Sequence, residues 1–424
     1  MSARLRGLLI DVTPLRASRE FRLLWTAQAI AVLGRQAVFV AVPYQVYVMT
    51  GSSLAVGLLS LGQAVPLVIA GLYGGALADR YDRRQTILWS QALTLLTSLA
   101  LAIGAIGLRA PLWFVFTVSA VSAATSTVQQ AARSAMVPRL VGPAALPAAL
   151  SLNQVILQLG FTAGPAVAGV VIAVVGLTWA YWLDVATMLM SCAVVWFLAP
   201  SPGSKAVRIH VGAAVEGLRE VWKNQVLAAS FLADLSAMVF GMPRALFPAI
   251  ALSIYRVGPT GLGLLYAAPG AGALLGTFFT GWVSRVRRQG RAVVVSIAIW
   301  GVGICVFALA SLAGPAALPL GLAMLAIAGA ADMVSALFRG AILQQTVPDE
   351  MRGRMSAFNA MVVTTGPRFG DFESGVVAGV WGVFVSVLSG GVLCLVGLGA
   401  VVWLMPTLAR YRVDDQEPAP AGAT

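Results

Sequence analysis

Long apolar runs alternate with short polar connections along almost the whole chain. Each run reaches or exceeds about 20 residues, the length at which an α-helix crosses the hydrocarbon core of a bilayer. Twelve such runs occur, at residues 21–49, 54–78, 86–108, 112–137, 148–176, 178–200, 226–250, 261–284, 292–313, 316–340, 356–385 and 386–409. The pattern predicts an all-α integral membrane protein with twelve transmembrane helices.

Composition and charge agree with this prediction. The chain of 424 residues is 59% hydrophobic and only 10% charged, whereas about a quarter of the residues in an ordinary globular protein are charged. The formal net charge of +12 could indicate nucleic acid, but the basic residues gather in alternate connections, and the opposite connections hold only Arg109 and Arg256. The positive-inside rule then predicts a multi-pass membrane protein with both termini in the cytoplasm. The basic residues are expected to contact lipid, not nucleic acid.

Residues suited to catalysis or metal binding are scarce. Cys192, Cys305 and Cys394 all fall within predicted spans, and the single histidine, His210, falls in a connection. No metal-ligand spacing or nucleophile–base grouping is present. The sequence therefore predicts that the protein is not an enzyme and needs no cofactor or metal.

The one long polar connection, residues 201–225, divides the predicted spans six and six. It predicts an N-terminal bundle at 1–200, a cytoplasmic connection at 201–225, a C-terminal bundle at 226–409 and a cytoplasmic tail at 410–424. Apolar positions Val215, Leu218 and Trp222 recur at helical spacing within the connection. They favour either an amphipathic helix on the membrane surface or a solvated linker helix.

The two halves resemble each other at an offset of 206 residues. This offset places Gly57 on Gly263, Asn153 on Asn359, and the series Gly160, Gly164 and Gly169 on Gly366, Gly370 and Gly375. Two six-helix pseudo-repeats joined by a long connection are a transporter architecture, in which the substrate binds near the bilayer midplane between the repeats.

A loop motif follows the second predicted span. The stretch GGALADRYDRR at 74–84 contains Gly75, Asp79, Arg80, Arg83 and Arg84, and LGFTAGPAVAG at 159–169 lies in the fifth span. Through these stretches the chain resembles the major facilitator superfamily over nearly its whole length. The resemblance implies that the loop is a latch between the halves during alternating access. A loop that only sets topology would explain the arginines but not Asp79.

The fifth-span stretch resembles a motif that the superfamily associates with exporters. Its residues here are Gly160, Gly164, Pro165 and Gly169. Small residues at this spacing allow close helix contact, so general helix packing is the alternative explanation. Stretches at 129–140, 337–358 and 366–375 resemble the branch that includes bacterial enterobactin exporters and related drug-efflux proteins.

Several charged residues lie inside the predicted spans. A charge facing lipid at mid-bilayer costs about 3 kcal/mol or more, so these residues are expected to face protein or a water-filled cavity. In TTGPRFGDFESG at 364–375, the spacing of Arg368 and Asp371 favours a pair along one helix, with Glu373 on another face. Asp332 and Arg339, two helical turns apart, share a face of span ten.

These charges are candidates for the coupling site and substrate cavity. Asp332, Arg339, Arg368, Asp371, Glu373, Asp234 and Arg35 form the candidate set. A proton-coupled exporter needs a carboxyl whose pKa changes as its surroundings alternate; a static network of ion pairs is the alternative. Arg35 would attract an anionic substrate or pair with an acid on a neighbouring helix, and Asp184 is interpreted as structural.

The sequence as a whole favours a secondary-active exporter. It would move a small amphipathic molecule, siderophore-like or a hydrophobic drug, by proton antiport with alternating access, and act as a monomer. The alternatives are a multidrug or macrolide-type pump without a siderophore role, and a membrane scaffold or sensor that keeps the fold without transporting. The charges inside spans ten and eleven argue against the scaffold.

Overall fold

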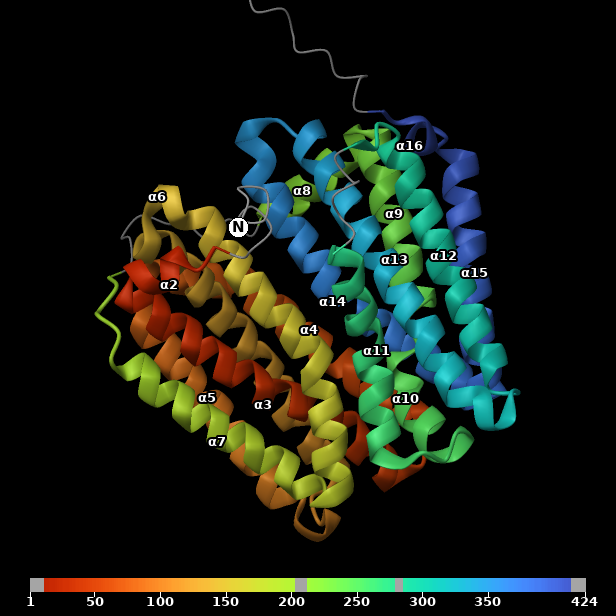
Figure 1. Ribbon diagram of the computed structural model, residues 1–424, viewed down its shortest axis with the longest axis horizontal. Helices are drawn as coiled ribbons and strands as arrows, with labels where there is room; N and C mark the ends of the chain where they lie inside the picture. Colours follow the sequence, from red (N-terminus) through yellow and green to blue (C-terminus); the bar gives the residue numbers. More distant parts are fainter. Residues whose placement is uncertain (1–10, 203–211, 279–284, 413–424) are drawn as a thin grey trace, which may run out of the picture. The chain divides into compact units, whose positions relative to one another are not determined.

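The structure is a computed structural model that describes residues 11–202, 212–278 and 285–412. These residues fold almost entirely into helices and contain no strand (Figure 1). The principal helices are α2 (Thr13–Ala17), α3 (Arg19–Thr50), α4 (Ser53–Arg80), α5 (Arg83–Gly104), α6 (Leu112–Val174), α7 (Leu177–Trp196), α8 (Gly212–Lys223), α9 (Gln225–Phe240), α10 (Phe247–Ala249), α11 (Gly258–Phe278), α12 (Gln289–Ala310), α13 (Ala317–Thr346), α14 (Asp349–Trp381), α15 (Val383–Leu404) and α16 (Thr407–Arg410).

Short polar side chains set where several helices begin. The Ser18 hydroxyl accepts a hydrogen bond from the Phe21 N–H, Ser52 accepts one from Ala55, and Asp82 accepts one from Gln85. Each bond satisfies a backbone donor that has no partner within the helix. These caps fix the starts of α3, α4 and α5.

Nine helical segments of the described residues are long and apolar enough to cross a membrane. One of them, α6, has 63 residues, so it would extend about 95 Å if straight, far more than a bilayer core of about 30 Å. At Gly142 the backbone is non-helical, with φ at 70°, and Pro143 follows. This break separates predicted spans four and five. The total of twelve spans stays a prediction.

The seventh predicted span is matched by the candidate membrane segment Gln225–Ile254, but this segment is not one continuous helix. Residues 226–250 were expected to form one helix, but α9 ends at Phe240, and the chain continues through a 3₁₀ turn at Arg244–Leu246, then α10, then a π-helical turn at Ile250–Ile254. Pro243 lacks an amide hydrogen, which favours the break. The Trp300 indole donates to the Gly241 carbonyl over 2.9 Å, so a freed backbone acceptor is satisfied by a neighbouring helix.

The chain divides into two compact units. Unit 1 comprises residues 1–210 with 247–267, and unit 2 comprises 211–246 with 268–424. The boundary at 246/247 coincides with the break in the seventh span, and α10 with the first part of α11 packs in unit 1. The predicted bundle boundaries at the central connection stay predictions. Within that connection, Gly217 of α8 packs on Phe358 of α14, while Leu218 and Trp222 are exposed.

Close helix contacts recur at the 206-residue offset. In unit 1, Gly160 packs against Val32, and in unit 2 their counterparts Gly366 and Met238 pack together. Likewise Gly34 meets Asp184 in unit 1, and Gly390 meets Phe240 in unit 2. Equivalent positions therefore make equivalent contacts, which supports the internal repeat inferred from the sequence.

Candidate functional site

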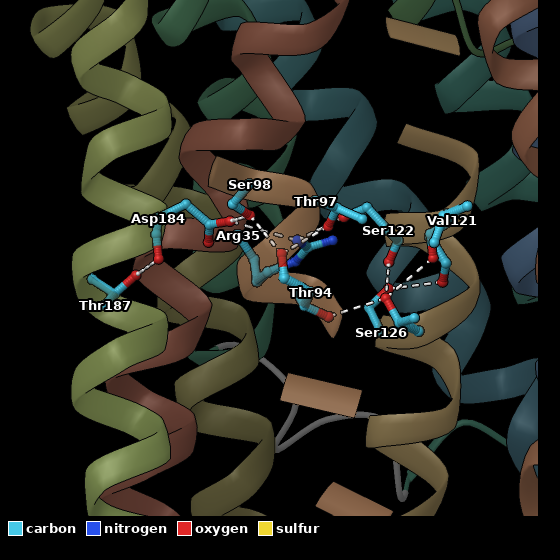
Figure 2. A network of polar contacts seen from close by, with 11 residues as sticks. Arg35, Thr94, Thr97, Ser98, Val121, Ser122, Ser126, Asp184 and Thr187 are labelled. Atoms are coloured by element: carbon cyan, nitrogen blue, oxygen red, sulfur yellow. Dashed lines mark hydrogen bonds and ion pairs between the residues drawn. The ribbon is translucent and has the colours of Figure 1, made fainter. Parts of the chain in front are cut away.

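A polar network lies inside unit 1 around Arg35 and Asp184 (Figure 2). Nη1 of Arg35 lies 3.6 Å from Oδ2 of Asp184 and donates to the Ser122 hydroxyl over 3.0 Å. The Ser98 hydroxyl donates a short hydrogen bond to the same carboxylate. Asp184 is fully buried, so the arginine supplies the charge compensation that a buried carboxylate requires.

The network joins four helices of unit 1. Arg35 comes from α3, Ser98 from α5, Ser122 from α6 and Asp184 from α7, and Figure 2 shows these side chains pointing toward one another. The close approach of α3 and α7 depends on Gly34, where a Cβ would collide with Asp184 and Thr187. Of the two sequence-based alternatives for Arg35, the geometry therefore matches pairing with an acid on a neighbouring helix.

The polar network continues between α5 and α6. The hydroxyls of Thr94 and Thr125 lie 3.0 Å apart, and Thr125 also bonds to the Ser122 carbonyl. The Ser98 hydroxyl, which donates to Asp184, also lies 3.0 Å from the Thr94 carbonyl oxygen. These hydroxyls bond mainly to backbone of their own helices, so the network is held rigidly around the charged pair.

A second charged cluster lies inside unit 2. Arg339 of α13 donates a short hydrogen bond to Asp234 of α9, and its Nη2 lies 3.8 Å from Oδ1 of Asp332 on its own helix. Asp234 is almost wholly buried, whereas the Asp332 side chain is 48% exposed. The structure thus brings together three members of the candidate set. The Arg339 guanidinium lies beside two carboxylates, so these three residues together contain one more acidic group than basic groups.

The charges of α14 have separate surroundings. Asp371 is buried, and its Oδ1 accepts a hydrogen bond from the Ala245 N–H over 3.1 Å. This places a carboxylate at the turn that restarts the broken seventh span, where backbone donors favour an anion. Glu373 is half-buried and has no hydrogen-bond or ion-pair partner among the described residues. The pairing of Arg368 with Asp371 stays a prediction.

The arginines of the loop motif contact aromatic rings and backbone carbonyls of unit 1. Nη2 of Arg84 donates to the Trp196 carbonyl over 2.5 Å, and the Arg84 guanidinium lies over the Trp196 ring. The Arg83 N–H donates to the Ser201 carbonyl over 2.9 Å, and Arg80 lies over the Tyr81 ring. A cation at the C-terminus of α7 complements the helix dipole. The surroundings of Gly75 and the side chain of Asp79 lie outside what the structure describes, so the latch stays a prediction.

The exporter-type motif packs α6 against two other helices. Gly160 and Gly164 face Val32 and Gln36 of α3, and Pro165 is buried beside them. Gly169 instead meets Gly263 of α11 so closely that a Cβ on either would collide with backbone. Both contacts lie within unit 1. The geometry accounts for the small residues by packing, and export as the purpose of the motif stays a prediction.

One buried cation was missed by the sequence reasoning. Arg133 of α6 is only 4% exposed, and its Nη2 lies 3.4 Å from the Ser191 hydroxyl of α7. The available signal was the repeat, because Arg133 stands 206 residues before Arg339. Arg133 lies close to the end of the predicted fourth span, and an arginine at such a place is ordinarily interpreted as a basic residue that orients the span in the membrane.

The sequence profile of the transmembrane secretion effectors, within the major facilitator superfamily, matches residues 11–421. The chain belongs to this family. Among curated relatives, the enterobactin exporter EntS of Citrobacter koseri is 28% identical over 418 residues, covering 98% of each chain. The enterobactin exporter EntS of Salmonella typhi is 26% identical over 409 residues, covering 95% of this chain and 96% of its own.

Solved structures of the superfamily's fold superpose on the chain. A bacterial homologue of the iron transporter ferroportin in the inward-facing state gives a TM-score of 0.68 at 16% identity, covering 92% of this chain and 98% of its own. The D323A mutant of the nucleoside transporter NupG gives a TM-score of 0.70 at 14% identity, covering 92% of this chain and 99% of its own. These structures share the fold, and the family match together with the curated relatives identifies the chain as a multi-pass membrane transporter of the major facilitator superfamily and not an enzyme.

Proposed function

We propose that the protein is a secondary-active exporter of a small amphipathic molecule, driven by proton antiport with alternating access. Export is supported by similarity over nearly the whole chain to proteins named enterobactin exporters. A siderophore-like cargo is the first proposal for this chain, and a hydrophobic drug is the second. We further propose that it acts as a monomer in the bacterial cytoplasmic membrane with both termini in the cytoplasm.

Proton coupling is supported mainly by the arrangement of charges around Arg339 in unit 2. Arg339 compensates Asp234 closely, which leaves half-exposed Asp332 as a second acid 3.8 Å from the same guanidinium. Half-buried Glu373 adds a carboxyl without a partner among the described residues. Carboxyls in such places can gain and lose a proton as their access to water changes. The buried Arg35–Asp184 pair is instead balanced, and we assign it a structural role.

The decisive experiment measures export with the proton gradient under control. Inverted membrane vesicles containing the protein would be loaded with a pH gradient and offered a catecholate siderophore or a macrolide. The proposal expects uptake into the vesicles that a protonophore abolishes, with vesicles lacking the protein as the control. Uptake that survives the protonophore would reject antiport, and no uptake of either compound would reject both cargo classes.

A further inference from the structure

Arg133 is a buried cation without a carboxylate partner among the described residues of unit 1, and the thiol of Cys192 is a weakly acidic group close enough to interact with it. Its Nε has no hydrogen-bond partner there, and its Nη2 reaches only the Ser191 hydroxyl at 3.4 Å. The described acids of this unit are committed elsewhere: Asp11 to Thr13, Glu20 to Ala199, Asp82 to Gln85, and Asp184 to Arg35 and Ser98. Burying an uncompensated guanidinium is costly, so a counter-charge is to be expected in some state of the protein.

In unit 2 the equivalent buried arginine has an acidic partner. Arg339 occupies the position equivalent to Arg133 at the 206-residue offset, and it is neutralised by Asp234. The position equivalent to Asp234 in unit 1 is Gln28, which is buried but carries no charge. The repeat therefore keeps the buried arginine in both halves and its acid in only one.

The surroundings of Arg133 hold it in place without neutralising it. The Ser191 hydroxyl donates to the Ala27 carbonyl over 2.9 Å and accepts from Gln91 Nε2 over 2.7 Å as well as from Arg133. Gln91 and Ser191 are both fully buried. Four helices, α3, α5, α6 and α7, thus meet at one serine. Among the described residues no acceptor is found for the Nε of Arg133, so the guanidinium can donate to a further acceptor.

We propose that Arg133 is an anion-binding residue that takes the oxyanion of a small acid, a carboxylate or a phosphate. The planar guanidinium suits such a group because two of its N–H bonds can reach two oxygens of one anion. The oxyanion comes either from an acidic group of the cargo, in which case the inference rests on the proposed function, or from a free anion. Arg133 is only 4% exposed, so the proposal requires a state of the protein in which an anion can reach the guanidinium.

The test measures thermal unfolding of the purified full chain in detergent. Sodium phosphate and sodium benzoate are compared with sodium chloride at equal ionic strength. A ligand that binds the folded state raises the unfolding temperature, and we expect a rise of at least about 2 °C over chloride. An equal response to both anions indicates a free oxyanion, and a response to benzoate alone indicates an acidic group on an organic cargo. No response to either anion overturns the proposal.

Two kinds of variant show whether Arg133 is responsible. Arg133→Gln should remove the response, but it could also fail to fold. Gln28→Asp keeps Arg133 and supplies the acid that Asp234 supplies in unit 2, so it should raise the unfolding temperature in chloride and lose the response to anions. Gln28→Asn is the matched control and should keep the response. A full response in Gln28→Asp overturns the proposal. Because this readout is binding, it is separate from the vesicle assay: anion binding without transport would reject export and leave the site standing.

Discussion

The hydroxyls of Tyr47 and Ser253 form a hydrogen bond of 2.8 Å, and the two residues stand 206 residues apart. This separation equals the repeat offset, so a residue of the first half contacts its own counterpart from the second half. Both residues belong to unit 1. Two residues at equivalent positions of the repeat therefore meet inside one compact unit.

The first prediction concerns the buried pair of unit 1. Arg35→Met leaves the Asp184 carboxylate buried without its cation, and we expect a loss of about 3 to 5 kcal/mol in unfolding free energy. The double variant Arg35→Met/Asp184→Leu should recover much of this loss because it leaves no buried charge. Thermal unfolding in detergent measures both. As the control, Lys223→Ala breaks the exposed pair with Glu220 and should change stability by less than about 1 kcal/mol. A mild effect of Arg35→Met alone would contradict a structural pair.

The second prediction separates two roles of Asp371. If its carboxylate serves to accept the Ala245 N–H, Asp371→Asn keeps an acceptor oxygen and should still transport, whereas Asp371→Ala should lose about 1 to 3 kcal/mol of stability. If Asp371 carries the coupled proton, Asp371→Asn should fold normally and fail to pump. Vesicle uptake and thermal unfolding of both variants decide between the two. We expect the first outcome.

The third prediction concerns Glu373. Glu373→Gln removes a titratable group that has no described partner, so we expect normal folding, loss of uphill export, and persistence of downhill movement of cargo. Asp332→Asn is the matched comparison because it removes the other under-compensated acid. If both variants pump against a gradient at the rate of the parent, the charges of unit 2 form a static network and proton coupling there is rejected.

The fourth prediction is the topology. Single cysteines replacing Arg109 and Arg256 should react with a membrane-impermeant thiol reagent added outside intact cells, and one replacing Arg287 should not. The physical reason is the positive-inside rule, which puts the arginine-rich connections in the cytoplasm. The parent protein is the control, because its three cysteines lie within predicted spans. Outside labelling at Arg287 would reverse the assignment.

Much of the helical pattern could be predicted from the sequence, because a bilayer imposes apolar runs of one approximate length. The break after Phe240 could not be predicted in this way, because the segment from Pro243 to Ile254 is as hydrophobic as a continuous transmembrane helix. Hydropathy measures the side chains and carries no information on whether the backbone hydrogen bonds of the helix continue. The repeat was visible because glycines keep their positions where helices touch, as at Gly160 and Gly366.

The partners of the charges could be predicted only along one helix. Asp332 and Arg339 lie two turns apart on α13, and their proximity followed from that spacing. The pairs Arg35–Asp184 and Arg339–Asp234 join different helices, and a single sequence carries no record of which helix faces which. Arg133 could have been singled out by applying the repeat offset to charges as well as to glycines.

The segment Phe247–Ala267, which belongs to unit 1, also bears on how the protein is made. Synthesis runs from the N-terminus, so residues 1–210 leave the ribosome before this segment exists. At about 5 to 20 residues per second, the delay is roughly three to eleven seconds. During that interval residues 1–210 lack two contacts of the finished unit, that of Tyr47 with Ser253 and that of Gly169 with Gly263. The first half of the newly synthesised chain therefore has to remain in the membrane without these two contacts until residues 247–267 have been made.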